Sequence, residues 1–349
     1  MKSKTIKSIM SRKFTAFCNS IDDKKVKELV LKNSIITGGS IVSLLTNEKV
    51  NDYDIYFTDK ETTKAVAQYY CKKFNELNKD RKNRLGKPLN AWVLDGEDVE
   101  KWKNGEKRIS EIHPNWEGSD QPYSENINIP VMFWNMTPDR IKVIVDSDGI
   151  IGEKVEDVLD DADAIDYEKV VETEEKSGNK EPYRPIFLSS NAITLSDNIQ
   201  LIVRFYGEAE NIHENFDFIH ATCYWRSSDG FLHLPSRALE AIINKELFYV
   251  GSKYPVCSIF RIKKFLKRGW NINAGQMLKI AMQISDLNLN DIATLEDQLV
   301  GVDSVYFYQV IEEIKKLDNF SMSAIIDRSY LMSAIIDRSY LVSVIDKIF

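Results

Sequence analysis

The sequence is poor in the residues that build disulfide frameworks, zinc sites and membrane spans. Its 349 residues include 4 Cys and 4 His, with no C-x-x-C pair and no His at zinc-finger spacing. No apolar run reaches the ~18 to 20 residues of a membrane span, and the N-terminus lacks the apolar core of a secretory signal. Positive charge is not in excess, since the formal net charge is −7. We therefore expect a cytoplasmic protein with no membrane partner, and only local basic patches for any nucleic-acid contact.

Apolar periodicity predicts an α+β fold. Apolar residues make up 43% of the chain, which is enough for a sizeable core. Alternating and β-branched segments predict strands at 52–57, 141–145, 192–195, 199–205 and 216–225, the last three as an antiparallel meander. Helical spacing predicts helices over most of the first 31 residues and at 65–79, 236–247, 258–268, 275–284 and 305–317.

The most informative stretch joins a glycine turn to two aspartates. Gly38, Gly39 and Ser40 lead into a short apolar helix, where backbone N–H groups can approach an anion and the Ser40 hydroxyl adds a donor. Eleven residues later, Asp52 and Asp54 share one face of a strand, about 7 Å apart. A hard divalent cation between these carboxylates offsets their repulsion. The pattern predicts Mg²⁺ or Mn²⁺ at the aspartates and the phosphates of a nucleoside triphosphate, ATP by expectation, at the glycine turn.

Transfer with two metal ions needs a third carboxylate, because the second ion lowers the pKa of the attacking hydroxyl. We predict Asp217 for this role, at the start of a strand that the meander brings beside the two aspartates. The alternative for Asp217 is an exposed acid at a strand end, and its competitors are Asp146, Asp148 and Asp197. By strand alternation, Tyr56 falls on the face of the two aspartates.

Gly-Gly-Ser followed by Asp-x-Asp with apolar neighbours resembles the head of nucleotidyltransferases of the DNA polymerase β superfamily. In that superfamily the third carboxylate comes from a later strand, which matches the position of Asp217. The segment 192–250, which contains Arg237, is similar to the second half of this head in poly(A) polymerases and tRNA CCA-adding enzymes. The chain is also similar to nucleotidyltransferase-like proteins of large phages and viruses. It departs from the CCA-adding pattern at Val42 and Ser43, where those enzymes carry Arg-Asp, and this argues against tRNA CCA addition.

The resemblance implies three parts of the chain. Residues 1–60 and 186–235 would form the nucleotidyltransferase head, a small mixed sheet with helices. Residues 61–185 would form an insertion, and residues 236–349 a helical C-terminal domain that closes over the nucleotide. A ten-residue sequence is repeated in tandem at 322–341. We interpret this repeat as a duplication that the fold tolerates, with docking of a protein partner as its alternative use.

Basic residues near the C-terminal helices are candidates for phosphate binding. Arg261, Lys264 and Arg268 share one face of the predicted helix 258–268, where they could contact the triphosphate or an RNA backbone. The alternative is a solvated helical face, and Arg237 has the same two interpretations. His220 should point away from Asp217 and pack in the core.

These residues together predict transfer of a nucleoside monophosphate from an NTP to a hydroxyl, with release of pyrophosphate. An RNA 3′ end is the expected acceptor, in the host cytoplasm for a viral chain. One alternative keeps the chemistry but modifies a protein or a small molecule, as toxin-like members do, and the acidic segment 153–181 favours it over RNA. The other alternative is a catalytically silent structural or binding module, for example in a virus particle.

Overall fold

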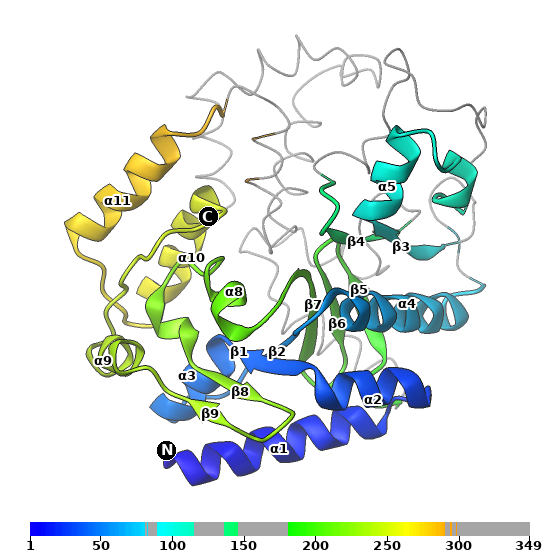
Figure 1. The fold of residues 1–349 in the computed structure, drawn as a ribbon. Helices are drawn as coiled ribbons and strands as arrows, with labels where there is room; N and C mark the ends of the chain where they lie inside the picture. Colours follow the sequence, from blue (N-terminus) through cyan, green and yellow to red (C-terminus); the bar gives the residue numbers. More distant parts are fainter. Residues whose placement is uncertain are drawn as a thin grey trace.

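The computed structural model describes residues 1–80, 82, 89–114, 136–145, 181–289, 294 and 298. Within this part of the chain, seven strands form one mixed sheet in the order β5-β6-β7-β2-β1-β8-β9, and β3 and β4 form a separate pair (Figure 1). In chain order the strands are β1 (Ser34–Thr37), β2 (Tyr53–Phe57), β3 (Ala91–Asp95), β4 (Ile141–Val145), β5 (Pro185–Leu188), β6 (Ala192–Leu195), β7 (Ile199–Tyr206), β8 (Tyr224–Arg226) and β9 (Leu232–His233).

The centre of the large sheet joins segments that are far apart in the sequence. Strand β1 pairs antiparallel with β2 on one side and with β8 on the other. Strand β2 pairs with β7 in parallel, which places the middle of the chain beside its beginning. The β6–β7 hairpin is antiparallel as predicted, and two of the three residues of its turn, Asp197 and Asn198, have positive φ angles.

The predicted strand at 216–225 is wrong over most of its length. The backbone of Asp217 and Ile219 bonds to residues 248–250 instead of the sheet, so that Phe218 forms only a single bridge with Tyr249. A 3₁₀ turn, η3 (Ile219–Thr222), follows, and only β8 remains as a strand. Because β8 lies across β1 from β2, the meander that would have carried Asp217 to β2 does not exist.

The helices largely follow the predicted periodicity. Their bounds in chain order are α1 (Ser3–Asn19), α2 (Lys24–Lys32), α3 (Gly39–Thr46), α4 (Lys60–Leu77), α5 (Gly96–Lys103), the 3₁₀ turn η1 (Ile109–Glu111), α8 (Ala209–His213), α9 (Ser236–Asn244), α10 (Pro255–Lys267) and α11 (Ala274–Ser285). Side-chain caps fix several starts: Asp23 accepts a hydrogen bond from the Val26 N–H, and Asn273 accepts one from the Gln276 N–H. The predicted helix at 305–317, the repeat at 322–341 and the acidic segment 153–180 lie outside the described residues.

The two faces of the large sheet have different cores. On one face Ile36, Ile55 and Leu201 pack with apolar residues of α1, α2 and α4 in a large cluster. On the other face Ile35 and Tyr56 pack with α8 and the start of α10 in a smaller one. Figure 1 shows this arrangement, with α1 and α2 below the sheet and α8 and α10 above it. The smaller cluster is the one that surrounds the predicted site.

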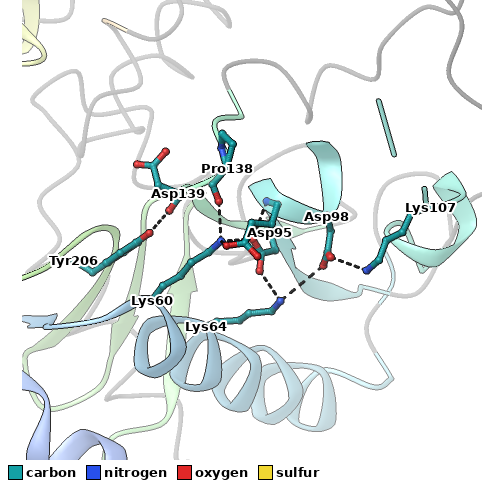
Figure 2. A network of polar contacts seen from close by, with 9 residues as sticks. Lys60, Lys64, Asp95, Asp98, Lys107, Pro138, Asp139 and Tyr206 are labelled. Carbon is teal, nitrogen blue, oxygen red and sulfur yellow. Dashed lines mark hydrogen bonds and ion pairs between the residues drawn. The ribbon is translucent and has the colours of Figure 1, made fainter. Parts of the chain in front are cut away.

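A network of ion pairs joins α4 to the β3–α5 segment (Figure 2). Asp95 is 5% exposed in its side chain and receives Lys60 at 2.9 Å and Lys64 at 2.5 Å. Asp95 also caps α5 by accepting the Glu97 N–H at 3.0 Å. Burial raises the pKa of Asp95, but the hydrogen bonds from Lys64 and Lys60 outweigh burial and lower that pKa below its ordinary value. The network therefore anchors the two-stranded unit to the main body by charge rather than by apolar contact alone.

None of the helices in the described ranges combines the length and the apolarity that crossing a bilayer demands. The four cysteines are all buried and unbridged, as expected for structural thiols, and burial raises the pKa of Cys18, Cys71 and Cys223 to about 12. The fold class with a nucleotidyltransferase head and the three-part domain division remain predictions, although the strands of the large sheet come from 34–57 and 185–233.

Candidate functional site

A row of polar residues crosses the middle of the large sheet. Strand pairing places Asp54 opposite Thr37 on β1 and Gln200 on β7, and continues from these to Tyr224 on β8 and Thr194 on β6. Residues that face each other across neighbouring strands point to the same side of a sheet. Asp54 therefore stands in the centre of a polar row on the face that α8 and α10 cover.

The glycine turn packs directly against Asp54. Gly38 has φ of +88° and ψ of −145°, a backbone conformation that residues with a Cβ rarely adopt. A Cβ built on Gly38 would stand 3.1 Å from Asp54 Oδ2. The Gly38 N–H donates to the Ala221 carbonyl at 3.1 Å, so in this structure the amide of Gly38, one of the predicted phosphate-binding residues, already has a partner.

The first turn of α3 keeps its anion-binding groups. Gly39 and Ser40 are the first residues of α3, so their N–H groups have no partner within the helix. The Ser40 hydroxyl is buried, and within the described part of the chain it makes no hydrogen bond. A buried hydroxyl without a partner is costly, and a ligand that takes the bond would offset this cost. Residues 39 and 40 thus fit a phosphate group better than Gly38 does.

Asp217 reaches the site from a loop and not from a strand. It lies between α8 and η3, is 7% exposed, and forms an ion pair with Arg261 of α10 in which Nη1 and Oδ2 are 2.8 Å apart. Arg261 was predicted as a phosphate ligand from its place on a basic helix. In the structure its guanidinium neutralises one of the three predicted carboxylates.

The three aspartates and Arg261 all act electrostatically on one buried phenol, Tyr56. Burial raises the pKa of Tyr56 well above its ordinary value; Asp54 raises it further, Arg261 lowers it, and Asp52 and Asp217 again raise it. Such effects decline with distance, so all four charged groups lie within electrostatic range of the Tyr56 hydroxyl. Asp52 precedes β2 directly, while Asp54 and Tyr56 lie on it. Tyr56 was not predicted as a site residue, although strand alternation had placed it on the correct face.

The half-buried His213 at the end of α8 ties that helix to Thr37 at the end of β1, next to the glycine turn. The Thr37 hydroxyl lies 2.9 Å from His213 Nε2 and 2.9 Å from the Cys223 carbonyl. Burial lowers the pKa of His213 to about 4, so the ring is neutral at pH 7. Because the Thr37 hydroxyl has one proton to give to the carbonyl, the Nε2–H of His213 donates to Thr37. The sequence offered no signal for this bond, since the two residues lie far apart in the chain.

The remaining candidates lie elsewhere or outside the described part. Asp197 sits in the β6–β7 turn, where it accepts the Tyr183 N–H, and Asp146 and Asp148 fall outside the described residues. Arg237 and Arg268 are exposed and Lys264 is half-buried, one turn beyond Arg261 on α10. His220 packs against Phe265 and Trp270 in the core, as predicted.

The carboxylates of Asp52 and Asp54 suit a hard divalent cation that keeps some of its bound water molecules. Among the described residues, no group of three or more His, Cys, Asp or Glu side chains is arranged to hold a metal ion. Mg²⁺ is commonly held by one or two carboxylates together with substrate phosphates and water, and Asp52 and Asp54 match this smaller set. The carboxylate of Asp217 is occupied by Arg261, so three protein ligands are not assembled in this state.

Comparison with known proteins gives the family. The model of the Gabija anti-defense 2 family matches residues 8–245, and the chain therefore belongs to this family. A similar protein is the Gabija anti-defense 2 of Bacillus phage SPbetaL7, with 22% identity over 133 residues that make up 36% of this chain and 31% of that protein. The alignment thus spans about a third of the relative's length. No solved structure matches this chain.

This family assignment corrects the interpretation drawn from the glycine turn and the Asp-x-Asp pair. The chain is not a member of the DNA polymerase β superfamily in the manner of poly(A) polymerases or CCA-adding enzymes, because both the family model and the phage relative identify Gabija anti-defense 2. Short motifs of this kind mislead because a glycine turn before a helix and two acids on a strand also arise in unrelated chains. The family match covers Gly38 to Asp217 but ends before Arg261.

Proposed function

We propose that this protein counteracts a Gabija-type defence inside the infected host cell by transferring a nucleoside monophosphate from an NTP to a hydroxyl of a component of that defence. The observation that carries the proposal is the position of Asp54 beside the Gly38 turn, together with the Asp217–Arg261 ion pair and the electrostatic influence of Asp52, Asp54, Asp217 and Arg261 on Tyr56. The anti-defence part rests on family membership. The chemical part rests on the side chains, independently of any family resemblance.

Asp52 and Asp54 are the residues that would hold Mg²⁺ or Mn²⁺. Their carboxylate oxygens are the hard donors that these ions prefer. When bound, the ion supplies charge neutralisation at the phosphates and lowers the pKa of the attacking hydroxyl. Gly38 leaves space for the Asp54 carboxylate, because a Cβ at this position would stand 3.1 Å from Oδ2 and displace it.

The other residues bind and orient the triphosphate. The N–H groups of Gly39 and Ser40 lie at the positive end of α3, and the Ser40 hydroxyl is without a partner in the described chain, so these groups favour the β- and γ-phosphates of ATP. Arg261 has five N–H donors and can bind a phosphate oxygen in addition to Asp217. The acceptor hydroxyl would then attack the α-phosphate in line, near Asp217, and pyrophosphate would leave toward α3.

The test uses purified full-length chain, purified Gabija proteins with nucleic acid, Mg²⁺ and each α-³²P-labelled NTP in turn. We expect label on a Gabija protein or on the nucleic acid with the wild type, and none with Asp52→Asn/Asp54→Asn. Asp286→Asn, an exposed acid at the end of α11, serves as the control and should label normally. In parallel, the double variant should lose protection of phage in Gabija-carrying cells, measured as plaque counts.

A second candidate function is antagonism by binding alone. The observation that favours it is the ion pair between Asp217 and Arg261, which gives the third carboxylate a structural partner. Full phage protection by Asp52→Asn/Asp54→Asn, with no label in any acceptor, would establish binding antagonism and exclude nucleotidyl transfer.

A further inference from the structure

Exposed apolar side chains concentrate on the two last helices of the described chain. Among the large apolar residues that are exposed there, five lie on α10 and α11, namely Ile259, Leu266, Met277, Leu278 and Met282. We call these five residues the α10–α11 surface. Figure 1 shows α11 at the outer edge of the molecule, with α10 between it and the sheet. This surface lies beyond residue 245, where the family match ends.

Helix α11 turns its apolar stripe away from the core. Leu278 and Met282 are one turn apart, on the same side of the helix, and are 60% and 61% exposed. Ile280 is the one residue of α11 that is buried. On α10, Ile259 and Leu266 lie seven residues apart and so share a face, with exposures of 50% and 46%. Helices normally bury such stripes, and exposed apolar patches of this kind mark interaction sites.

The charged residues of α10 and α11 themselves are all basic, and the acids Glu246 and Asp286 flank this segment. Residues 247–285 contain seven Lys or Arg and no Asp or Glu, although the whole chain has a net charge of −7. Lys267, Arg268 and Lys279 are exposed next to the apolar residues. The surface is thus apolar with a basic surround, and a complementary surface is apolar with an acidic surround.

We propose that the α10–α11 surface docks a partner protein through an acidic, apolar contact surface, such as an amphipathic helix with Leu on one side and Glu on the other. A second copy of this chain is disfavoured, since a two-fold contact would bring the Lys and Arg side chains of one surface against those of the other. The phosphates of a nucleic acid would pair with the Lys and Arg side chains but leave Leu278 and Met282 without apolar contact. Methionine and leucine that project from a helix suit a protein groove or helix.

Binding is measured by fluorescence anisotropy with the full chain and a synthetic amphipathic peptide of about 20 residues, long enough to be helical, that carries Leu and Glu. A peptide with Lys in place of Glu is the charge control. We expect the chain to bind the Glu peptide and not the Lys peptide. Leu278→Ser/Met282→Ser should weaken binding by at least about tenfold, since two apolar side chains lose their contacts. Leu31→Ser, which removes a 41% exposed leucine from α2, should bind as the wild type does.

A charge exchange sharpens the test. Lys267→Glu/Lys279→Glu should transfer the preference from the Glu peptide to the Lys peptide. Equal binding of both peptides by the wild type would overturn the proposal. Three other interactions are measured with the same variants: co-sedimentation with phosphatidylglycerol vesicles, binding of single-stranded RNA, and dimer formation in sedimentation velocity. The proposal would also be overturned if Leu278→Ser/Met282→Ser abolished one of these interactions and left peptide binding unchanged. None of these variants alters the aspartates, so the labelling experiment remains an independent test of the chemistry.

Discussion

Replacing Gly38 by alanine adds one methyl group, which tests both the backbone conformation of the turn and its contact with Asp54. The φ and ψ angles of Gly38, +88° and −145°, would cost an L-residue about 1–3 kcal/mol. The new methyl group would also stand 3.1 Å from Asp54 Oδ2, so the carboxylate would have to move by a few tenths of an ångström. We expect Gly38→Ala to lower the free energy of unfolding by about 2–4 kcal/mol, which combines the strained backbone with this displacement.

Gly39→Ala is the matched control for this substitution. Gly39 is the first residue of α3, and a Cβ there meets nothing within 4 Å. Alanine favours the helix over glycine by up to about 1 kcal/mol, so Gly39→Ala should leave stability unchanged or raise it slightly. The two substitutions are at neighbouring positions, but only Gly38→Ala is expected to lower the free energy of unfolding.

Urea unfolding followed by tryptophan fluorescence measures both variants, and Mg²⁺-dependent ATP binding is measured by calorimetry. Removing the Asp54 side chain in Gly38→Ala/Asp54→Ala should relieve the steric part of the loss and leave the backbone part. If Gly38→Ala is no less stable than Gly39→Ala, the turn does not hold the conformation described, and the argument that it positions Asp54 is refuted.

Two further substitutions probe ion pairs. Arg261→Gln should lower the free energy of unfolding by about 2–3 kcal/mol in urea titrations, because the largely buried Asp217 carboxylate loses a charged partner at 2.8 Å; a loss below about 0.5 kcal/mol would mean that water replaces the guanidinium. Asp95→Asn should destabilise the protein at pH 7, since the hydrogen bonds from Lys64 and Lys60 hold the pKa of Asp95 below its ordinary value despite burial. This stabilisation is present above the unfolded-state pKa and is lost as the pH falls through the lower folded-state pKa. The difference in thermal midpoint between wild type and Asp95→Asn should therefore shrink from pH 5 to pH 2, and an unchanged difference would contradict the reasoning.

Local patterns in the sequence predicted the secondary structure around the candidate site well. Strand alternation placed Asp54 and Tyr56 on one face, and β2 begins one residue later than expected. The start of α3 after Gly38 also followed from the glycines and the apolar residues behind them. These features depend on neighbours within a few residues, which is the range over which periodicity carries information.

Long-range pairing was not predictable in the same way. Nothing local distinguishes a β7 that pairs with β6 alone from one that also pairs in parallel with β2. Asp217 approaches Tyr56 because its loop bonds to residues 248–250 and to Arg261, contacts that depend on where α10 packs. The error at 216–225 has the same origin, since an apolar run of that length can be a strand or a buried loop and only tertiary contacts decide between the two.

The parallel pairing of β2 with β7 has a consequence for how the protein is made. Strands β1 and β2 emerge from the ribosome early, but their outer neighbours, β7 and β8, follow only after residues 58–198 have been synthesised. Closing so long a loop is slow, and until it closes both edges of the β1–β2 strand pair stay open to other chains. The Asp54 segment therefore has two open strand edges until β7 and β8 have been made, and such edges favour association with other chains during synthesis.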